Sequence, residues 1–191
     1  MPLPDAGPLS DVAVTAALEA GRGALVTIAP GDTSMAPLLG TGDAVWVVPL
    51  PADPRVGEVL VFRQQEYLVV HRYLGRAVTS GGTPCLRTRG DRRNRLDPPL
   101  PPTLVRGRVA AVRRRGAWSD LSGPGARAFA RAVAAHALFW AAAGNAARPV
   151  GLDRVVARID AALLTIAVPG LVPLLHRRIP APAPSGPSKT P

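Results

Sequence analysis

The sequence predicts a mainly β protein: a compact antiparallel β-domain followed by a C-terminal α-helical extension. From about residue 24 to residue 115, short runs rich in Val, Leu and Ile alternate with clusters of Gly, Pro and Asp, as expected of strands joined by turns. Beyond residue 117 the chain is rich in alanine, the residue with the highest helix propensity. A chain of 191 residues is long enough to bury a core.

The individual elements follow from local patterns. The stretch "SDVAVTAALEAG", residues 10–21, predicts a short helix because it begins with Ser and Asp as N-cap candidates and ends at glycine. The predicted strands are "ALVTIA", "DAVWVV", "GEVLVF", "EYLVVHRYL" and "LVRGRVAAV". The stretches "PLPADPRVG" and "TSGGTP" indicate connections. "RGDRRNRLDPPLPP" is too charged and too rich in proline for a strand interior, and we expect a loop.

The composition divides the chain into four parts. These are an N-terminal helical lead-in (1–23), a β-domain (24–116), a helical extension (117–179) and a tail (180–191) whose low complexity predicts disorder. In the extension, an apolar run from Ala161 to Leu175 is shorter than the ~20 residues of a membrane span and is interrupted at Pro169. Two interpretations stay open: a helical hairpin packed on itself or on the β-domain, or helices in peripheral contact with a membrane.

Charge and composition narrow the classes of partner. The net charge is +10, but Lys189 is the single lysine among 23 basic residues, a bias typical of GC-rich coding rather than of function. Aromatic residues are only 4% of the chain, and no nucleic-acid-binding motif is present, so we expect no nucleic-acid partner. The N-terminal stretch lacks a basic segment followed by a clean apolar run, which predicts a cytoplasmic protein, with membrane association left to the C-terminal helices.

The sequence predicts no metal or cofactor. Cys85 is the only cysteine, so an internal disulfide and a cysteine-based metal site are both excluded. The three histidines lack the spacing of metal ligands. "SGGTP" contains glycines but not the Gly-Lys-Ser/Thr ending of a phosphate-binding loop.

Nucleophilic catalysis is the chemistry that the β-domain could support. Ser34 lies in "GDTSMAPLLGTGD", and a serine hydroxyl needs a base to accept its proton. Lysine is excluded by counting, which leaves His71, because histidine accepts protons near neutral pH. Either Asp91 or Asp97, in the loop that follows, could orient the imidazole, and the spacing alone does not choose between them.

Five stretches, in order, resemble the boxes of the type I signal peptidase superfamily of serine endopeptidases. They are "TSMAPLLGTGDAVWV", "RVGEVLVF", "VVHRYLG", "RTRGDRRNRLD" and "VRGRVAAV", and the match covers roughly residues 25–113, about half the chain. The histidine in the third stretch is similar to the archaeal and endoplasmic-reticulum branch, where the bacterial branch carries lysine. The resemblance implies a β-domain of the signal-peptidase and LexA-like type and cleavage of a leader or signal segment from a precursor polypeptide.

The resemblance also implies roles for single residues. Ser34 would be the nucleophile, with its backbone N–H donating to the oxyanion, and His71 the general base. Asp97 falls at the family's acidic position and would orient His71, while Asp91 would substitute for it or act structurally. Three neighbours of the serine have supporting roles: Met35 and Pro37 shape the turn and the substrate pocket, and Thr33 offers a hydroxyl donor.

Departures from the family pattern favour other readings. Asp32 stands where the family often has a hydroxyl residue, and a carboxylate there would oppose the negative charge of an oxyanion. The alternative function is therefore a catalytically impaired peptide-binding module of the same fold. A self-cleaving LexA-like repressor is disfavoured because the catalytic lysine is missing and only 33 residues precede Ser34. The absence of a membrane anchor before the serine predicts a dedicated precursor rather than housekeeping removal of secretory signals.

Overall fold

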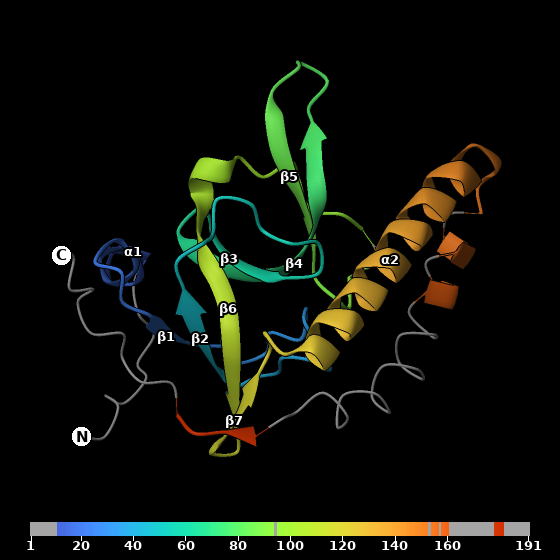
Figure 1. Ribbon diagram of the computed structural model, residues 1–191. Coiled ribbons are helices and arrows are strands. Elements are labelled where there is room, and N and C mark those ends of the chain that lie inside the picture. The colour runs from blue at the N-terminus through green and yellow to red at the C-terminus, as the bar shows by residue number, and fades with distance from the viewer. Residues whose placement is uncertain (1–10, 94, 153, 157, 161–177, 182–191) are drawn as a thin grey trace.

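The computed structural model describes residues 11–93, 95–152, 154–156, 158–160 and 178–181 (Figure 1). The fold is mainly antiparallel β with a C-terminal helix, as the sequence predicts. Its helices are α1 (Asp11–Glu19), η1 (Pro102–Leu104), α2 (Pro124–Ala147) and η2 (Arg148–Val150). Its strands are β1 (Ala24–Thr27), β2 (Ala44–Val48), β3 (Val59–Gln64), β4 (Tyr67–Val78), β5 (Pro84–Arg89), β6 (Val105–Arg114), β7 (Ala117–Asp120) and β8 (Arg178–Ile179).

The strands form one sheet in the order β1-β2-β6-β3-β4-β5, and every pair is antiparallel. Strand β6 also pairs with β7, which in turn pairs with β8. Figure 1 shows β6 running through the middle of the domain and the β4–β5 hairpin extending away from it. Within this sheet, β4 pairs with β3 through its first half and with β5 through its second half, so the middle of β4 lies between two neighbours.

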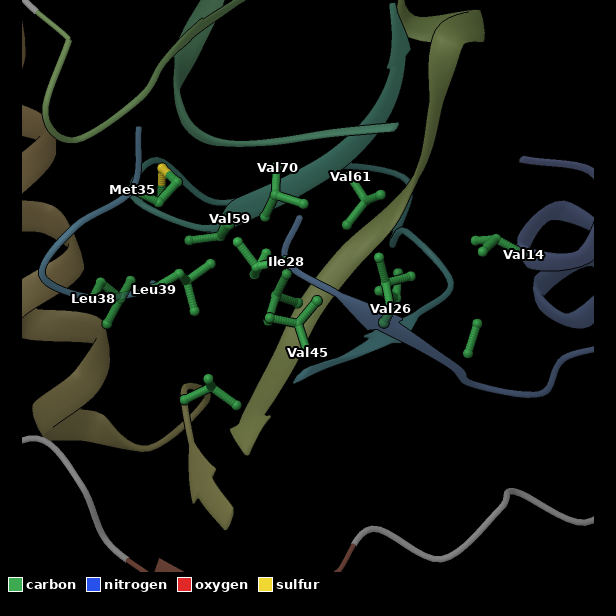
Figure 2. Packing of buried hydrophobic residues seen from close by; sticks show 14 of the residues in the cluster. Val14, Val26, Ile28, Met35, Leu38, Leu39, Val45, Val59, Val61 and Val70 are labelled. Carbon is green, nitrogen blue, oxygen red and sulfur yellow. The ribbon is translucent and has the colours of Figure 1, made fainter. Parts of the chain in front are cut away.

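The main core fixes the segment that carries Ser34. Figure 2 shows side chains from α1, from the strands and from the segment after Ser34 gathered in one interior. The buried members of this cluster are Val14, Leu18, Ala24, Val26, Ile28, Met35, Leu38, Leu39, Val45, Val47, Val59, Val61, Val70, Val109 and Val112. Burial of a Leu or Met side chain contributes about 1.5–3 kcal/mol. Three such side chains within residues 35–39 therefore hold the chain beside Ser34 in place.

Helix α2 packs closely on the β-domain. Gly57, at φ +98°, lies so near the helix that a Cβ there would come within 2.6 Å of the carbonyl carbon of Ala130. Ala134 and Ala137 are buried on the same helix and pack with Leu74 of β4. This part of the extension thus packs on the β-domain, one of the two interpretations above. The apolar run from Ala161 to Leu175 lies outside the described residues, and no helix among those described could cross a membrane.

Three strands were not among the strands predicted from the sequence: β5, β7 and β8. The last of them, Arg178–Ile179, falls at the end of the predicted helical extension and pairs with β7. The first residue of β5, Pro84, and its last, Arg89, fall in stretches that were predicted to be a turn and a loop. β7 covers the first four residues of the predicted helical extension and pairs with β6, so the sheet continues past residue 116 to Asp120. The helix begins only at Pro124, a residue well suited to the first turn. The predicted tail from residue 182 onward lies outside the described residues.

Candidate active site

Ser34 lies in a turn between β1 and β2 and is buried, with 7% of its surface exposed. The residues after it anchor the turn from below: Met35 is in the core, and the carbonyls of Pro37 and Leu38 accept hydrogen bonds from Arg114 Nη2 at 3.2 and 2.9 Å. Thr33, on the other side, is exposed. The segment that follows Ser34 is thus held in place by buried contacts, while Thr33, which precedes it, faces solvent.

His71 comes from the middle of β4 and reaches Ser34. The distance from His71 Nε2 to Ser34 Oγ is 3.2 Å, and His71 Nδ1 lies 2.7 Å from Asp97 Oδ2. An ionised carboxylate only accepts hydrogen bonds, so the imidazole proton is on Nδ1 and Nε2 is left to accept from the serine. The structure therefore brings Ser34, His71 and Asp97, the predicted catalytic residues, into one chain of hydrogen bonds.

Asp97 is held by two contacts to Thr88 of β5. Thr88 Oγ1 donates to Asp97 Oδ2 at 2.7 Å, and the Asp97 backbone N–H donates to the Thr88 carbonyl at 2.9 Å. Burial on its own would raise the pKa of Asp97. The hydrogen bond and charge of His71, the Thr88 hydroxyl and the nearby charge of Arg93 outweigh it, and the pKa is lowered from its ordinary value. Asp97 is therefore an anion that can stabilise a protonated His71.

Asp91 takes a different partner. Arg72 donates to it through Nε at 2.6 Å and Nη2 at 2.5 Å, and Arg72 Nη1 donates to the Gly57 carbonyl at 2.7 Å. Arg72 and Asp91 are both buried, with 1% and 5% of their surfaces exposed. Of the two acids that the spacing left open, Asp97 contacts His71. Asp91 instead forms a buried bidentate ion pair with Arg72, the residue that follows His71 on β4.

Gly90 leaves the space in which the Ser34 loop and His71 approach each other. A Cβ at this position would lie 2.8 Å from the Ser34 carbonyl oxygen and 2.9 Å from His71 Nε2. The next residues close over the serine: the Arg92 backbone N–H donates to that same Ser34 carbonyl at 2.8 Å. Any larger residue at Gly90 would push the serine loop and the histidine apart.

The backbone N–H of Ser34 is engaged in this state of the protein. It donates to Asp32 Oδ1 at 2.9 Å, which closes a side-chain turn over the serine. The resemblance assigns this N–H to the oxyanion, so the Asp32 carboxylate occupies the donor that a tetrahedral intermediate would use. Beside it lies an open cavity of about 490 Å³, lined by Gly31, Asp32, Thr33, Ser34, Arg92 and Arg93.

A second cluster of charged side chains joins the end of β5 to α2. Arg89 Nη1 donates to Asp160 Oδ2 at 3.2 Å, and His136 Nδ1 of α2 lies 3.6 Å from Asp160 Oδ1. Burial lowers the pKa of His136; the charge of Arg89 acts in the same direction, and that of Asp160 opposes it. No cluster of three or more His, Cys, Asp and Glu side chains suited to a metal ion occurs in the described part of the chain.

Sequence reasoning missed three residues that shape the site: Arg72, Thr88 and Gly90. Two of them left a usable signal. Arg72 directly follows His71 on a strand, so its side chain must point to the opposite face and needs its own acid there. Gly90 precedes the acid of the fourth box, where a close approach of backbone is a common reason for glycine. Thr88 carried no signal in the sequence.

Comparison of the chain with known protein families, with curated proteins and with solved structures finds no match.

Proposed function

We propose that this protein is a serine endopeptidase that cleaves a leader or signal segment from a precursor polypeptide. The observation that carries the proposal is the hydrogen-bonded chain from Ser34 Oγ through His71 to Asp97. The ordered resemblance of five sequence stretches to the signal peptidase superfamily supports the polypeptide substrate and the signal-peptidase and LexA-like type of β-domain. No metal or cofactor has a part in the proposed reaction.

The proposed reaction follows from the positions of these atoms. Ser34 Oγ attacks the scissile carbonyl carbon while His71 Nε2 takes its proton, and Asp97 stabilises the imidazolium through Nδ1–H. His71 then gives the proton to the leaving amine, and an acyl-serine remains. Water, deprotonated by His71, releases the acyl group and restores the serine. For the oxyanion to use the Ser34 N–H, the Asp32 carboxylate must first leave it.

The test is cleavage of a peptide library prepared from a whole proteome, with new N-termini sequenced after incubation. The wild-type protein should generate a consistent set of cuts, and Ser34→Ala and His71→Ala should each lose all of them. Ser119→Ala is a matched control, because Ser119 is a buried serine of β7 that pairs opposite Val112 in the sheet. Cuts that persist in Ser34→Ala protein would refute the proposed nucleophile.

A second candidate is a peptide-binding module without turnover. The observation that favours it is the 2.9 Å hydrogen bond from the Ser34 N–H to Asp32, which places a negative charge on the oxyanion donor. This candidate predicts that library peptides bind the wild-type and Ser34→Ala proteins equally well and that neither protein cuts them. Cleavage by the wild type alone excludes it.

A further inference from the structure

Two arginines stand at the candidate nucleophile. Arg92 and Arg93 are exposed and line the same cavity as Ser34. Their backbone is fixed: the Arg92 N–H donates to the Ser34 carbonyl at 2.8 Å, and the Arg93 N–H donates to the Gly90 carbonyl at 2.9 Å. The fold thus fixes the backbone of both arginines beside Ser34, while their side chains are exposed to solvent.

The position of Arg93 is further defined by its contacts. A Cβ on Gly90 would lie 2.9 Å from both Arg93 Cγ and His71 Nε2, so the stem of Arg93 passes close to the catalytic imidazole. The charge of Arg93 also reaches Asp97, whose pKa it helps to lower. A group bound by Arg93 would therefore lie on the same side of the site as Ser34 and His71.

Neither guanidinium is neutralised by the described part of the chain. Arg72 and Arg114, which lie elsewhere in the domain, are paired with carboxylates, Asp91 and Asp43. Within the residues that the structure describes, Arg92 and Arg93 form no side-chain hydrogen bond or ion pair. Both guanidinium groups are therefore available to bind a ligand.

The cavity keeps a net positive charge even though Asp32 lines it. Two guanidinium groups face one carboxylate, and an oxygen of that carboxylate already accepts from the Ser34 N–H. Arginine is the side chain best suited to a carboxylate, since its planar fork donates two parallel hydrogen bonds.

We propose that this cavity accepts an Asp or Glu side chain of the substrate, at a position flanking the scissile bond, and that Arg92 and Arg93 bind it. The proposal rests on the peptidase function proposed above and names the class of peptide that the enzyme selects. Asp32 opposes such a side chain, so it limits the preference rather than creating it.

The experiment uses a synthetic library of randomised octapeptides and, from its best cleaved member, a matched pair that carries Glu or Gln at the position of strongest acidic enrichment. The quantity measured is the ratio of kcat/KM for the Glu peptide to that for the Gln peptide. In the wild type we expect a ratio of about ten, and in Arg92→Gln/Arg93→Gln a ratio near one, because exposed ion pairs contribute modestly. Added salt should lower the wild-type ratio.

Two further variants separate recognition from structure. Asp32→Asn removes the opposing charge and should raise the Glu-to-Gln ratio, whereas Arg87→Gln, at an exposed arginine of β5 outside the cavity, should leave it unchanged. A damaged fold would not move the ratio in opposite directions in the two cavity variants. The proposal is overturned if the wild type shows no acidic enrichment, or if the double variant loses the same factor on both peptides.

The outcome stays separate from that of the peptidase function. Cleavage that needs Ser34 but ignores acidic residues would leave the peptidase standing and sink the acidic preference. If the wild type cuts no library member, the same library is passed over immobilised Ser34→Ala protein. Acidic peptides retained there, and lost with Arg92→Gln/Arg93→Gln, would support the acidic site, and retention without acidic enrichment would overturn it.

Discussion

Replacement of Asp32 by serine is expected to activate the proposed peptidase. In the free protein Asp32 Oδ1 accepts a hydrogen bond from the Ser34 N–H at 2.9 Å, and a substrate carbonyl must compete with it for the same donor. A hydrogen bond to a charged group contributes about 1.5–3 kcal/mol. Since 1.4 kcal/mol corresponds to a factor of ten, release of the N–H should raise kcat about 10- to 100-fold. Loss of a single oxyanion donor in other enzymes costs a factor of about 10²–10³, a comparable scale.

The assay is single-turnover cleavage of the best peptide found in the proteome library. Asp32→Asn tests the role of charge, because its amide oxygen can still accept from the Ser34 N–H but carries no negative charge, and we expect a smaller rise in kcat. Asp53→Ser makes the same charge change at an exposed aspartate that pairs with Arg76, outside the cavity at Ser34, and should leave kcat unchanged. If folded Asp32→Ser protein is no faster than wild type, the carboxylate does not obstruct the oxyanion donor.

Three more variants probe the rest of the site. Gly90→Ala would place a Cβ 2.8 Å from the Ser34 carbonyl, and the displaced serine should lower kcat about 100-fold, while the overpacking should also cost about 1–3 kcal/mol of unfolding free energy; normal activity and stability would contradict the close approach. Asp97→Asn should lower kcat by about 10²–10⁴, because the imidazole loses its charged partner. The lowered pKa of Asp97 also means that its contribution to stability is complete above its ordinary value of 3.8 and is lost as the pH falls through its lower folded value; urea titrations at stepped acid pH should show this component in the wild type and not in Asp97→Asn. Arg72→Met leaves Asp91 buried without a partner and should cost about 3–5 kcal/mol of unfolding free energy in urea, most of it recovered in Arg72→Met/Asp91→Leu; a neutral single variant would argue against the buried pair.

The strands that sequence reasoning found are those whose burial is apolar. β2, with "AVWVV", and β3, with "VLVF" at its start, are predicted by their β-branched and aromatic residues. β5 is harder to find because only Cys85 and Leu86 are apolar among its buried residues. Its other two buried residues are polar: Thr88 contacts Asp97, and Arg89 contacts Asp160. Those partners lie elsewhere in the chain, and no local pattern identifies them. β7 was missed because its four residues are too few to form a pattern.

The candidate site shows the same division. The serine and the histidine could be found by elimination among residue types, since a single lysine and three histidines leave few bases. The choice between Asp91 and Asp97 could not be made from spacing, because it depends on the opposite faces to which His71 and Arg72 point. The turn by which Asp32 engages the Ser34 N–H is likewise a matter of three-dimensional geometry.

The consecutive residues His71 and Arg72 have a consequence for how the chain folds. In the native pairing His71 lies opposite Leu60 and Arg72 opposite Val59. A slip of β4 by one position would exchange the two faces, so that a guanidinium met Ser34 and an imidazole met Asp91. Such a molecule would lose its proton acceptor and its buried ion pair together. The alternation of His71 and Arg72 therefore makes a one-residue slip of β4 costly at two places at once, beside Ser34 and beside Asp91.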